Sequence, residues 1–360
     1  MPIRVLLVED SQLTLVILRR ILKSSSQIEV VGEARTGLEA LELIPNLQPD
    51  VICTDLHMPK MDGLEFTSEV MALYPRPILV ISSWVQEEDT PHVFQLLEAG
   101  ALDIFPKPSA GLTTEDKVLN QELINKIQIL SGVKVFKKKR KSSSLARRLE
   151  TFSSKSYAKP EIIAIGASTG GPQAINELFA QLPADFPVPI ICVQHICLGF
   201  LQGFLDWLAT NCRLPIQIAE PGDIPKPGTI YFPREQQHLE LDDRGRFICS
   251  NSPPFDGHRP SATVMFKSVA KFYGRAAVGI LLTGMGRDGA EGMQYIAQAG
   301  GLTIAQDEAT SVIFGMPKQA IDLGAAKLVL PIHAIAPKLL NLVQKKPSFS
   351  ETRYRNSKIL

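Results

Sequence analysis

Several features that would mark whole classes of protein are scarce in this sequence. Its 360 residues include only five cysteines, and no two form a C-x-x-C pair, so neither a disulfide framework nor a zinc site is expected. No stretch approaches the roughly 18 apolar residues of a membrane span. The formal net charge of +1 gives no global case for nucleic-acid binding. With only six histidines, candidates for a catalytic base are few.

The remaining composition is that of ordinary globular material. Hydrophobic residues make up 45% of the chain, and its length favours two domains over one. The segment 1–10 turns acidic after a short apolar run, which is not the pattern of a signal peptide. We therefore expect a cytoplasmic protein with reduced thiols, a monomer that neither inserts into membranes nor binds nucleic acid.

The most informative stretch is the glycine-rich segment 166–171. It follows the apolar run 162–165 and precedes a segment with Pro172 in the first turn of an expected helix. Ser168 therefore lies on a strand-to-helix turn with the G-x-S-x-G spacing of a nucleophile elbow. A glycine-rich turn of this kind also cradles phosphates or serves only as a tight turn, so the motif alone leaves three interpretations open.

The first third of the chain alternates apolar runs with segments of helical spacing. The runs at 3–8, 29–33, 49–55, 77–83 and 101–108 predict five strands, each followed by a helix. Five such units in about 125 residues predict a doubly wound parallel sheet, whose sites lie at the carboxyl ends of the strands.

Polar groups stand at four of these strand ends, namely Glu9 with Asp10, Asp55, Ser82 and Lys107. Converging carboxylates would repel one another unless a cation lay among them, and oxygen ligands favour Mg²⁺. Asp55 would then accept a phosphoryl group whose charge Lys107 balances. Each acid taken alone is as well explained as a helix N-cap, but the whole set is not.

This region resembles the receiver domain of two-component response regulators over residues 2–125. The resemblance is carried by Glu9-Asp10, by Asp55 with the segment 58–63, and by Ser82 and Lys107-Pro108. It implies phosphorylation of Asp55 by a histidine kinase, Mg²⁺ held by Glu9, Asp10 and Asp55, and a switch read through Ser82. Ile104 stands where receivers usually carry the switch aromatic.

A polar segment separates the two expected domains. Residues 126–159 contain the basic run 137–141 and several serines, and few apolar residues that could pack. A solvated linker explains this composition better than a nucleic-acid or membrane contact. We expect a receiver domain over 1–125, a catalytic domain over 160–345 and a polar tail over 346–360.

The second domain repeats the pattern of polar residues at strand ends. His195 ends the apolar run 188–195, and Asp288 follows the run 276–282 in a glycine-rich turn. A histidine within reach of Ser168 would act as its general base, and Asp288 would orient that histidine. His238 and His258 are rival bases, although we expect His238 to be structural and His258 to contact substrate.

Other features of this domain leave choices open. Asp307 is a second candidate for the acid, and Asp288 alone would also suit a helix N-cap. The order Ser, His, Asp differs from that of the α/β-hydrolases. The short apolar runs 216–219, 229–232, 238–241 and 247–249 predict an antiparallel excursion from an otherwise parallel sheet.

The segments 165–171, 193–195, 258–261, 282–289 and 305–309 together resemble the catalytic domain of chemotaxis response-regulator protein-glutamate methylesterases, the CheB family. The resemblance spans about 160–345 and implies an α/β fold, with Ser168 as nucleophile, His195 as base, Asp288 as orienting acid, and Thr169 and the Met285 backbone near the oxyanion. Cys197 and Leu201 depart from the family at the expected rim of the cleft.

The resemblance also implies the reaction and its partners. The expected reaction is hydrolysis of glutamate methyl esters on chemoreceptors, together with glutamine deamidation, and it needs no metal. A chemotaxis histidine kinase would be the phosphodonor, and the unphosphorylated receiver is expected to cover the cleft. A DNA-binding regulator, a catalytically dead scaffold and a general esterase are the rival interpretations.

Overall fold

The computed structural model describes residues 1–82, 90–108, 114–135 and 157–344. The chain divides into two compact units, each built on its own parallel sheet. None of the helices in these ranges is long and apolar enough to cross a membrane. The basic run 137–141 and the polar tail lie outside the described residues.

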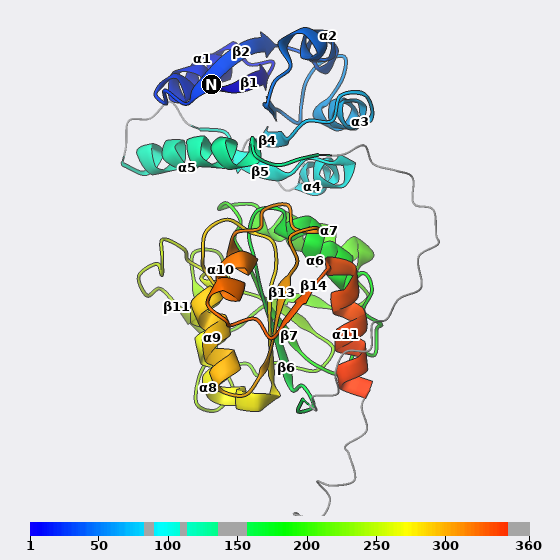
Figure 1. The fold of residues 1–360 in the computed structure, drawn as a ribbon, viewed down its shortest axis with the longest axis vertical. Coiled ribbons are helices and arrows are strands. Elements are labelled where there is room, and N and C mark those ends of the chain that lie inside the picture. Colours follow the sequence, from blue (N-terminus) through cyan, green and yellow to red (C-terminus); the bar gives the residue numbers. More distant parts are fainter. Residues whose placement is uncertain (83–89, 109–113, 136–156, 345–360) are drawn as a thin grey trace, which may run out of the picture. The chain divides into compact units, whose positions relative to one another are not determined.

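The first unit contains all five predicted strand–helix pairs (Figure 1). Its elements are β1 Ile3–Val8, α1 Gln12–Lys23, β2 Ile28–Ala34, α2 Gly37–Leu47, β3 Val51–Thr54, α3 Gly63–Leu73, β4 Ile78–Ser82, α4 Thr90–Ala99, β5 Asp103–Pro106 and α5 Thr114–Leu130. The strands are parallel throughout and lie in the order β2-β1-β3-β4-β5. The chain leaves β1 toward one side and returns to β3 on the other, which opens a crevice at the ends of these two strands.

Two local details of this unit follow from its sequence. The N-caps Ser11, Thr36 and Asp62 each accept a backbone N–H of the helix that they begin, as short polar side chains at that position do. Helix α5 continues to Leu130, so the helical chain extends past the expected domain boundary at residue 125.

The second unit has a seven-stranded sheet in the order β14-β13-β12-β6-β7-β9-β8, parallel throughout. The elements of the chain from residue 162 on are β6 Ile162–Ala167, α6 Gly171–Phe179, β7 Ile190–Gln194, α7 Leu201–Asn211, β8 Ile216–Ile218, β9 Ile230–Phe232, β10 His238–Leu241, β11 Phe247–Ser250, α8 Ala262–Tyr273, β12 Ala277–Leu281, α9 Ala290–Gln298, β13 Leu302–Gln306, α10 Met316–Asp322, β14 Leu328–Leu330 and α11 Ile332–Gln344, with a short 3-10 turn at Gly274–Ala276.

The predicted antiparallel excursion is half wrong. Strands β8 and β9 join the main sheet in parallel, and only β10 and β11 form an antiparallel hairpin. The reason lies in the connections. The segment 219–229 is long enough to carry the chain back along three-residue strands, whereas 242–246 permits only a hairpin.

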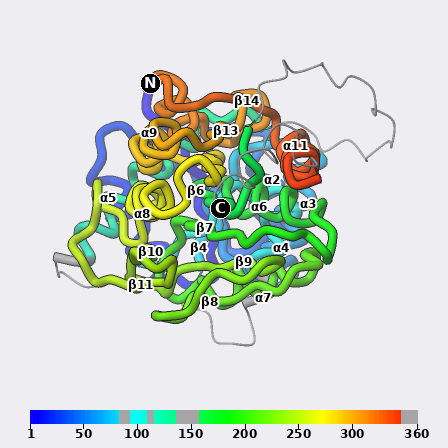
Figure 2. Tube along the Cα trace, turned by 90° about the horizontal axis from the view of Figure 1, so that it is seen from below, coloured from blue at the N-terminus to red at the C-terminus, as the bar shows by residue number. Residues whose placement is uncertain are grey.

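Helices cover both faces of the second sheet (Figure 2). Helices α8 and α9 pack together on one face, and α6 and α11 pack together on the other. The central strands β6, β7 and β12 are buried along their whole length, as strands covered on both faces are. The first strand, β6, lies between β7 and β12, so the chain runs in opposite directions from it and the carboxyl ends of these three strands form the switch point.

Candidate active site

Ser168 and His195 lie side by side at the switch point of the second sheet. Each is the first residue after its strand, and the strands β6 and β7 are paired with Ala167 opposite Gln194. The backbone N–H of His195 donates to the Ala167 carbonyl at 2.9 Å, which extends this register by one residue. Asp288 comes from the loop after β12, the strand on the other side of β6.

The turn that carries Ser168 is bent at a glycine. Gly170 has φ 75°, the left-handed conformation, and a Cβ there would lie 2.5 Å from the Cβ of Val312. In a nucleophile elbow the serine itself occupies the strained position, but Ser168 does not have a positive φ. The N–H of Ser168 donates to the Thr283 carbonyl at 3.0 Å, and that of Gly171 donates to the Ser168 carbonyl at 2.7 Å.

His195 contacts Asp288 through the far nitrogen of its ring. Nε2 lies 2.8 Å from Oδ2 of Asp288, and because an ionised carboxylate only accepts hydrogen bonds, Nε2 carries the proton. The other nitrogen, Nδ1, is buried and has no hydrogen-bond partner within the described part of the chain. In a neutral ring, this arrangement leaves Nδ1 as the nitrogen that can accept a proton.

Asp288 is buried and surrounded by donors. Oδ1 accepts from Oγ of Ser261 at 2.7 Å and from the N–H groups of Thr263 at 3.0 Å and Gly289 at 2.9 Å, while Oδ2 accepts from the N–H of Ala262 at 2.7 Å. Two of these donors are the first N–H groups of α8, where a negative charge is stabilised by the helix dipole. Burial by itself raises the pKa, but the hydrogen bonds hold the pKa of Asp288 well below its usual range.

The side chain of Gln194 links the backbones of Ser168 and His195 by hydrogen bonds. Its Nε2 donates to the Ser168 carbonyl at 2.9 Å and to the His195 carbonyl at 2.7 Å. The side chain is 4% exposed, and a Cβ on Gly171 would lie 2.0 Å from Oε1 of Gln194. Glycine at 171 therefore leaves the space in which this amide sits.

The other residues expected near the oxyanion lie on the loops around Ser168. Thr169 is buried, and its carbonyl accepts from Oγ1 of Thr283 at 3.0 Å. Met285 is 37% exposed on the loop after β12. A Cβ on the preceding Gly284 would lie 2.8 Å from the Cβ of Ser168, so this loop packs directly against the serine.

Two of the rival candidates have structural roles. His238 is buried, with Nδ1 accepting the N–H of Ser261 at 3.2 Å and Nε2 facing the Pro253 carbonyl at 3.2 Å. Asp307 accepts from both the N–H and the hydroxyl of Thr310, at 3.0 and 2.6 Å, and so holds the turn after β13. His258, in contrast, lies on the ring of His195.

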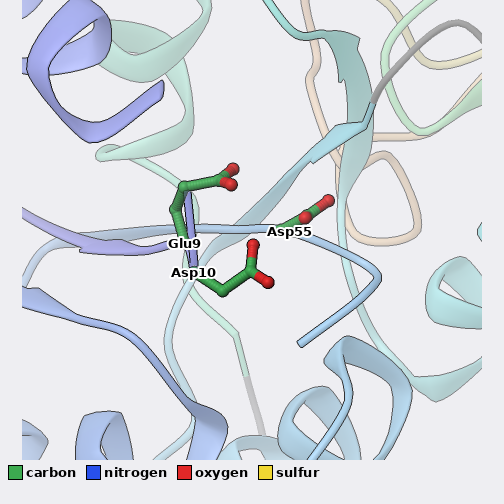
Figure 3. Close-up of side chains that lie close together, drawn as sticks. All are labelled: Glu9, Asp10 and Asp55. Carbon is green, nitrogen blue, oxygen red and sulfur yellow. The ribbon is translucent and has the colours of Figure 1, made fainter. Parts of the chain in front are cut away.

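In the first unit, three carboxylates gather at the ends of β1 and β3. Glu9, Asp10 and Asp55 each offer an oxygen, and these atoms lie within 4.8 Å of one another (Figure 3). Lys107, which follows β5, donates from Nζ to Asp55 Oδ2 at 2.7 Å and to Glu9 Oε1 at 3.0 Å. Ser82 is buried at the end of β4, and its carbonyl accepts the N–H of Lys107 at 2.8 Å.

The electrostatics of this cluster suit a divalent cation. Burial, followed by the neighbouring Asp55, raises the pKa of Glu9 to about 7. Burial also raises the pKa of Asp55, although Lys107 opposes it. The ammonium of Lys107 alone does not compensate three carboxylates, so the oxygen-only donor set fits Mg²⁺. Ile104, at the position of the switch aromatic, is buried in β5 opposite Val80.

Several residues that build the candidate active site had no role assigned from the sequence. These are Gln194, Ser261, Thr263 and Thr283, together with Gln306, whose Oε1 accepts the N–H of Thr283 at 2.8 Å. Only their positions in the sequence could have indicated a role, since all but Thr263 lie inside the motifs that carried the family resemblance. Nothing in spacing alone shows that Ser261 and Thr263 donate to Asp288.

Fold and site together define a response regulator whose receiver precedes an α/β domain of the serine-hydrolase kind. Residues 163–339 match the model of the CheB methylesterase family, and residues 5–136 match that of the response regulator receiver domain. The chain is 38% identical over 347 residues to the protein-glutamate methylesterase/protein-glutamine glutaminase of Nitrosospira multiformis, covering 96% of this chain and 98% of that protein.

Further comparisons agree. A protein-glutamate methylesterase/protein-glutamine glutaminase of Anaeromyxobacter dehalogenans is 42% identical, over 95% of this chain and 98% of its own length. The crystal structure of the Thermotoga maritima CheB methylesterase catalytic domain matches with a TM-score of 0.50 and 37% identity, covering 51% of this chain and 99% of that one. The chain therefore belongs to the CheB family of methylesterases, and the resemblance predicted from the sequence is confirmed.

Proposed function

We propose that this protein is a phosphorylation-regulated hydrolase that removes methyl esters from glutamate side chains of chemoreceptors and deamidates glutamines at the same kind of position. The observation that carries this proposal is the pairing of half-buried His195 with buried Asp288 beside Ser168, which leaves Nδ1 of His195 without a hydrogen-bond partner in the described part of the chain. The activity named for the full-length relatives supplies the substrate class.

Ser168 is the nucleophile of the proposed reaction. Its Oγ attacks the ester carbonyl carbon while Nδ1 of His195 takes the hydroxyl proton. The tetrahedral intermediate collapses, the C–O bond to the methoxy group breaks, and His195 returns the proton to release methanol. Water activated by the same nitrogen then hydrolyses the acyl-enzyme, leaving the glutamate carboxylate. With a glutamine, the leaving group is ammonia.

Asp288 orients His195 and stabilises the imidazolium that forms in each half of the reaction. Its five hydrogen bonds keep the carboxylate ionised and fixed in place. The negative charge that develops on the substrate oxygen is assigned to backbone N–H groups of Thr169 and Met285. One such donor contributes roughly 3–4 kcal/mol in comparable acyl-transfer sites.

Asp55 is the proposed phosphorylation site, and a chemotaxis histidine kinase is the proposed donor. Glu9, Asp10 and Asp55 would hold Mg²⁺, which when bound neutralises the charge of the carboxylates and of the incoming phosphoryl group. Lys107 would pair with the phosphoryl oxygens, and Ser82 would report their presence to the rest of the domain. Phosphorylation is proposed to relieve inhibition of the hydrolase by the receiver. A cytoplasmic location and a monomeric state stay predictions.

The test is methanol release from methylated receptor membranes by the native protein and by Ser168→Ala, each with and without acetyl phosphate. We expect release that rises with the phosphodonor and disappears in Ser168→Ala. Release that persists in Ser168→Ala would refute the nucleophile, and release that ignores the phosphodonor would refute the regulation. A panel of small esters separates the rival general esterase, which would hydrolyse them as readily as the receptor.

A further inference from the structure

A second imidazole lies flat on the ring of His195. The ring centroids of His195 and His258 are 4.0 Å apart, and their planes differ by 8°. The hydrogen bond to Asp288 holds one atom of the His195 ring but allows the ring to tilt about that atom. Contact across the whole face removes this tilt, so edge and face together fix the ring.

His258 is the last residue of a tight hairpin turn that begins at Phe255. Phe255 and His258 exchange two backbone hydrogen bonds, of 3.1 and 2.9 Å, around Asp256 and Gly257. These two residues have φ of 48° and 82°, the left-handed pair of a type I′ turn, for which Asp-Gly is a preferred sequence. The position of the His258 ring is therefore set by a stiff two-residue loop.

The loop that supplies Asp288 also holds this turn. Arg287 grips the Asp256 carboxylate with two hydrogen bonds of 3.0 Å, from Nε to Oδ2 and from Nη2 to Oδ1. Such a bidentate fork fixes orientation as well as distance. Two adjacent residues therefore act on the two stacked rings. Arg287 holds the turn that carries His258, and Asp288 holds the edge of the His195 ring.

The surroundings keep His258 uncharged. Burial, then the adjacent His195, lower the pKa of His258 to about 4, against the opposing pull of Asp288 and Asp256. Arg287 compensates Asp256, and Arg259 turns its guanidinium to the carbonyls of the segment 251–252. A neutral ring face attracts a cation stacked on it, whereas a charged ring would repel one.

We propose that His258 is a positioning residue that acts through His195, holding its ring plane and presenting a neutral aromatic face to the imidazolium formed when His195 takes the Ser168 proton. This inference rests on the proposed role of His195 as general base. Because the two rings lie parallel and face to face, the contact between His258 and His195 is a stacking contact and not a hydrogen bond between ring nitrogens.

The test compares His258→Phe, which keeps an aromatic face, with His258→Leu, which keeps apolar bulk without one. Methanol release from methylated receptor gives kcat and KM, and the rate at which a fluorophosphonate labels Ser168 gives a readout that does not depend on the receptor. We expect His258→Phe to keep kcat within about threefold, and His258→Leu to lose roughly tenfold or more in kcat and in labelling rate at an unchanged KM. The acid limb of the pH–rate profile should move to lower pH in His258→Leu only.

A third variant tests the arrangement without touching the ring. Arg287→Gln frees the turn, and because the Arg287 side chain is 71% exposed its loss leaves folding intact. We expect a severalfold drop in kcat with KM unchanged. Arg234→Gln, which removes an exposed arginine paired with Glu220 elsewhere in the unit, is the matched control and should behave as wild type.

The outcomes separate this inference from the proposed function. If Ser168→Ala is inactive while His258→Leu matches wild type in kcat and labelling rate, the inference fails and the proposed function stands. A raised KM in both His258 variants with kcat unchanged would make His258 a substrate contact and overturn the positioning role. Ser168→Ala that keeps its activity would remove the proposed function itself.

Discussion

His195 offers Nε2, not Nδ1, to Asp288, at 2.8 Å. In the Ser-His-Asp template of the serine proteases the acid holds Nδ1 and Nε2 is the base. In the proposed reaction this reversed arrangement would make Nδ1 the base, and this nitrogen lies close to its own backbone. Such a base reaches only a serine whose backbone is also near, and Ser168 and His195 are the first residues after two hydrogen-bonded strands. The pairing of β6 with β7 and the choice of ring nitrogen are therefore linked, because Nδ1 needs a serine on the adjacent strand.

Replacement of Asp288 by asparagine tests this pair. The amide has one acceptor oxygen for five donors and no charge to stabilise the imidazolium, so we expect kcat to fall by about 10³–10⁴. Methanol release and fluorophosphonate labelling of Ser168 measure the effect, with circular dichroism to confirm folding. Asp307→Asn is the matched control, because Asp307 only holds the turn after β13. Equal losses in both variants would mean that the effect is general destabilisation.

Gln194→Glu tests the link that the Gln194 amide forms between the backbones of Ser168 and His195. The substitution keeps the shape but replaces the amide donor that serves the Ser168 and His195 carbonyls with an oxygen that faces both of them. A lost pair of buried hydrogen bonds costs about 1–3 kcal/mol in the free energy of unfolding. We expect that loss in urea denaturation, and at least a tenfold lower kcat. Wild-type kinetics in a folded Gln194→Glu protein would show that this link does not set the geometry.

The sequence predicted most reliably the positions in the fold of residues that directly follow a strand. Glu9, Asp55, Ser168 and His195 all do, and the carboxyl ends of neighbouring parallel strands converge whatever the side-chain details. Asp288 lies further along its loop, and the N-terminus of α8 that stabilises it belongs to an earlier part of the chain.

Three features were beyond local patterns. The direction of β8 and β9 depends on how a connecting segment crosses the sheet, which apolar runs of three or four residues do not encode. Helix α10, Met316–Asp322, was not predicted, because seven residues starting at Met316-Pro317 show little periodicity. The tautomer of His195 and its stacking on His258 depend on tertiary contacts between residues far apart in the chain.

The free energy of unfolding of the second unit should decrease as the pH is lowered, in two separate pH ranges. Since the pKa of His258 is about 4 in the folded protein and near 6.5 when unfolded, the unfolded chain binds a proton between these values that the folded one does not. The free energy of unfolding should therefore drop as pH falls from 6.5 to 4, by at most about 3 kcal/mol. Below pH 4 the loss should continue, because the lowered pKa of Asp288 adds stability only while its carboxylate is ionised.

Urea denaturation at a series of pH values, on wild type and His258→Phe, measures both windows. The phenylalanine variant has no titrating group at this position, so its curve should be flatter between pH 6.5 and 4 and should still fall below pH 4. Parallel curves over the upper window would contradict a neutral, half-buried His258.

Replacement of Asp55 by asparagine tests the receiver site. Burial in the folded protein raises the pKa of Asp55, so its charged form is less favourable there than in the unfolded chain, and a neutral amide should raise the free energy of unfolding of this unit. Acetyl phosphate should no longer increase methanol release, because the acceptor carboxylate is gone, and Mg²⁺ titration by calorimetry should show weaker binding. Asp50→Asn is the control, since the Asp50 side chain accepts the N–H of Arg4 away from the cluster and an amide oxygen can do the same. Stimulation that survives in Asp55→Asn would move the phosphorylation site to another residue, whereas loss of stimulation in both variants would point to disruption of the receiver fold.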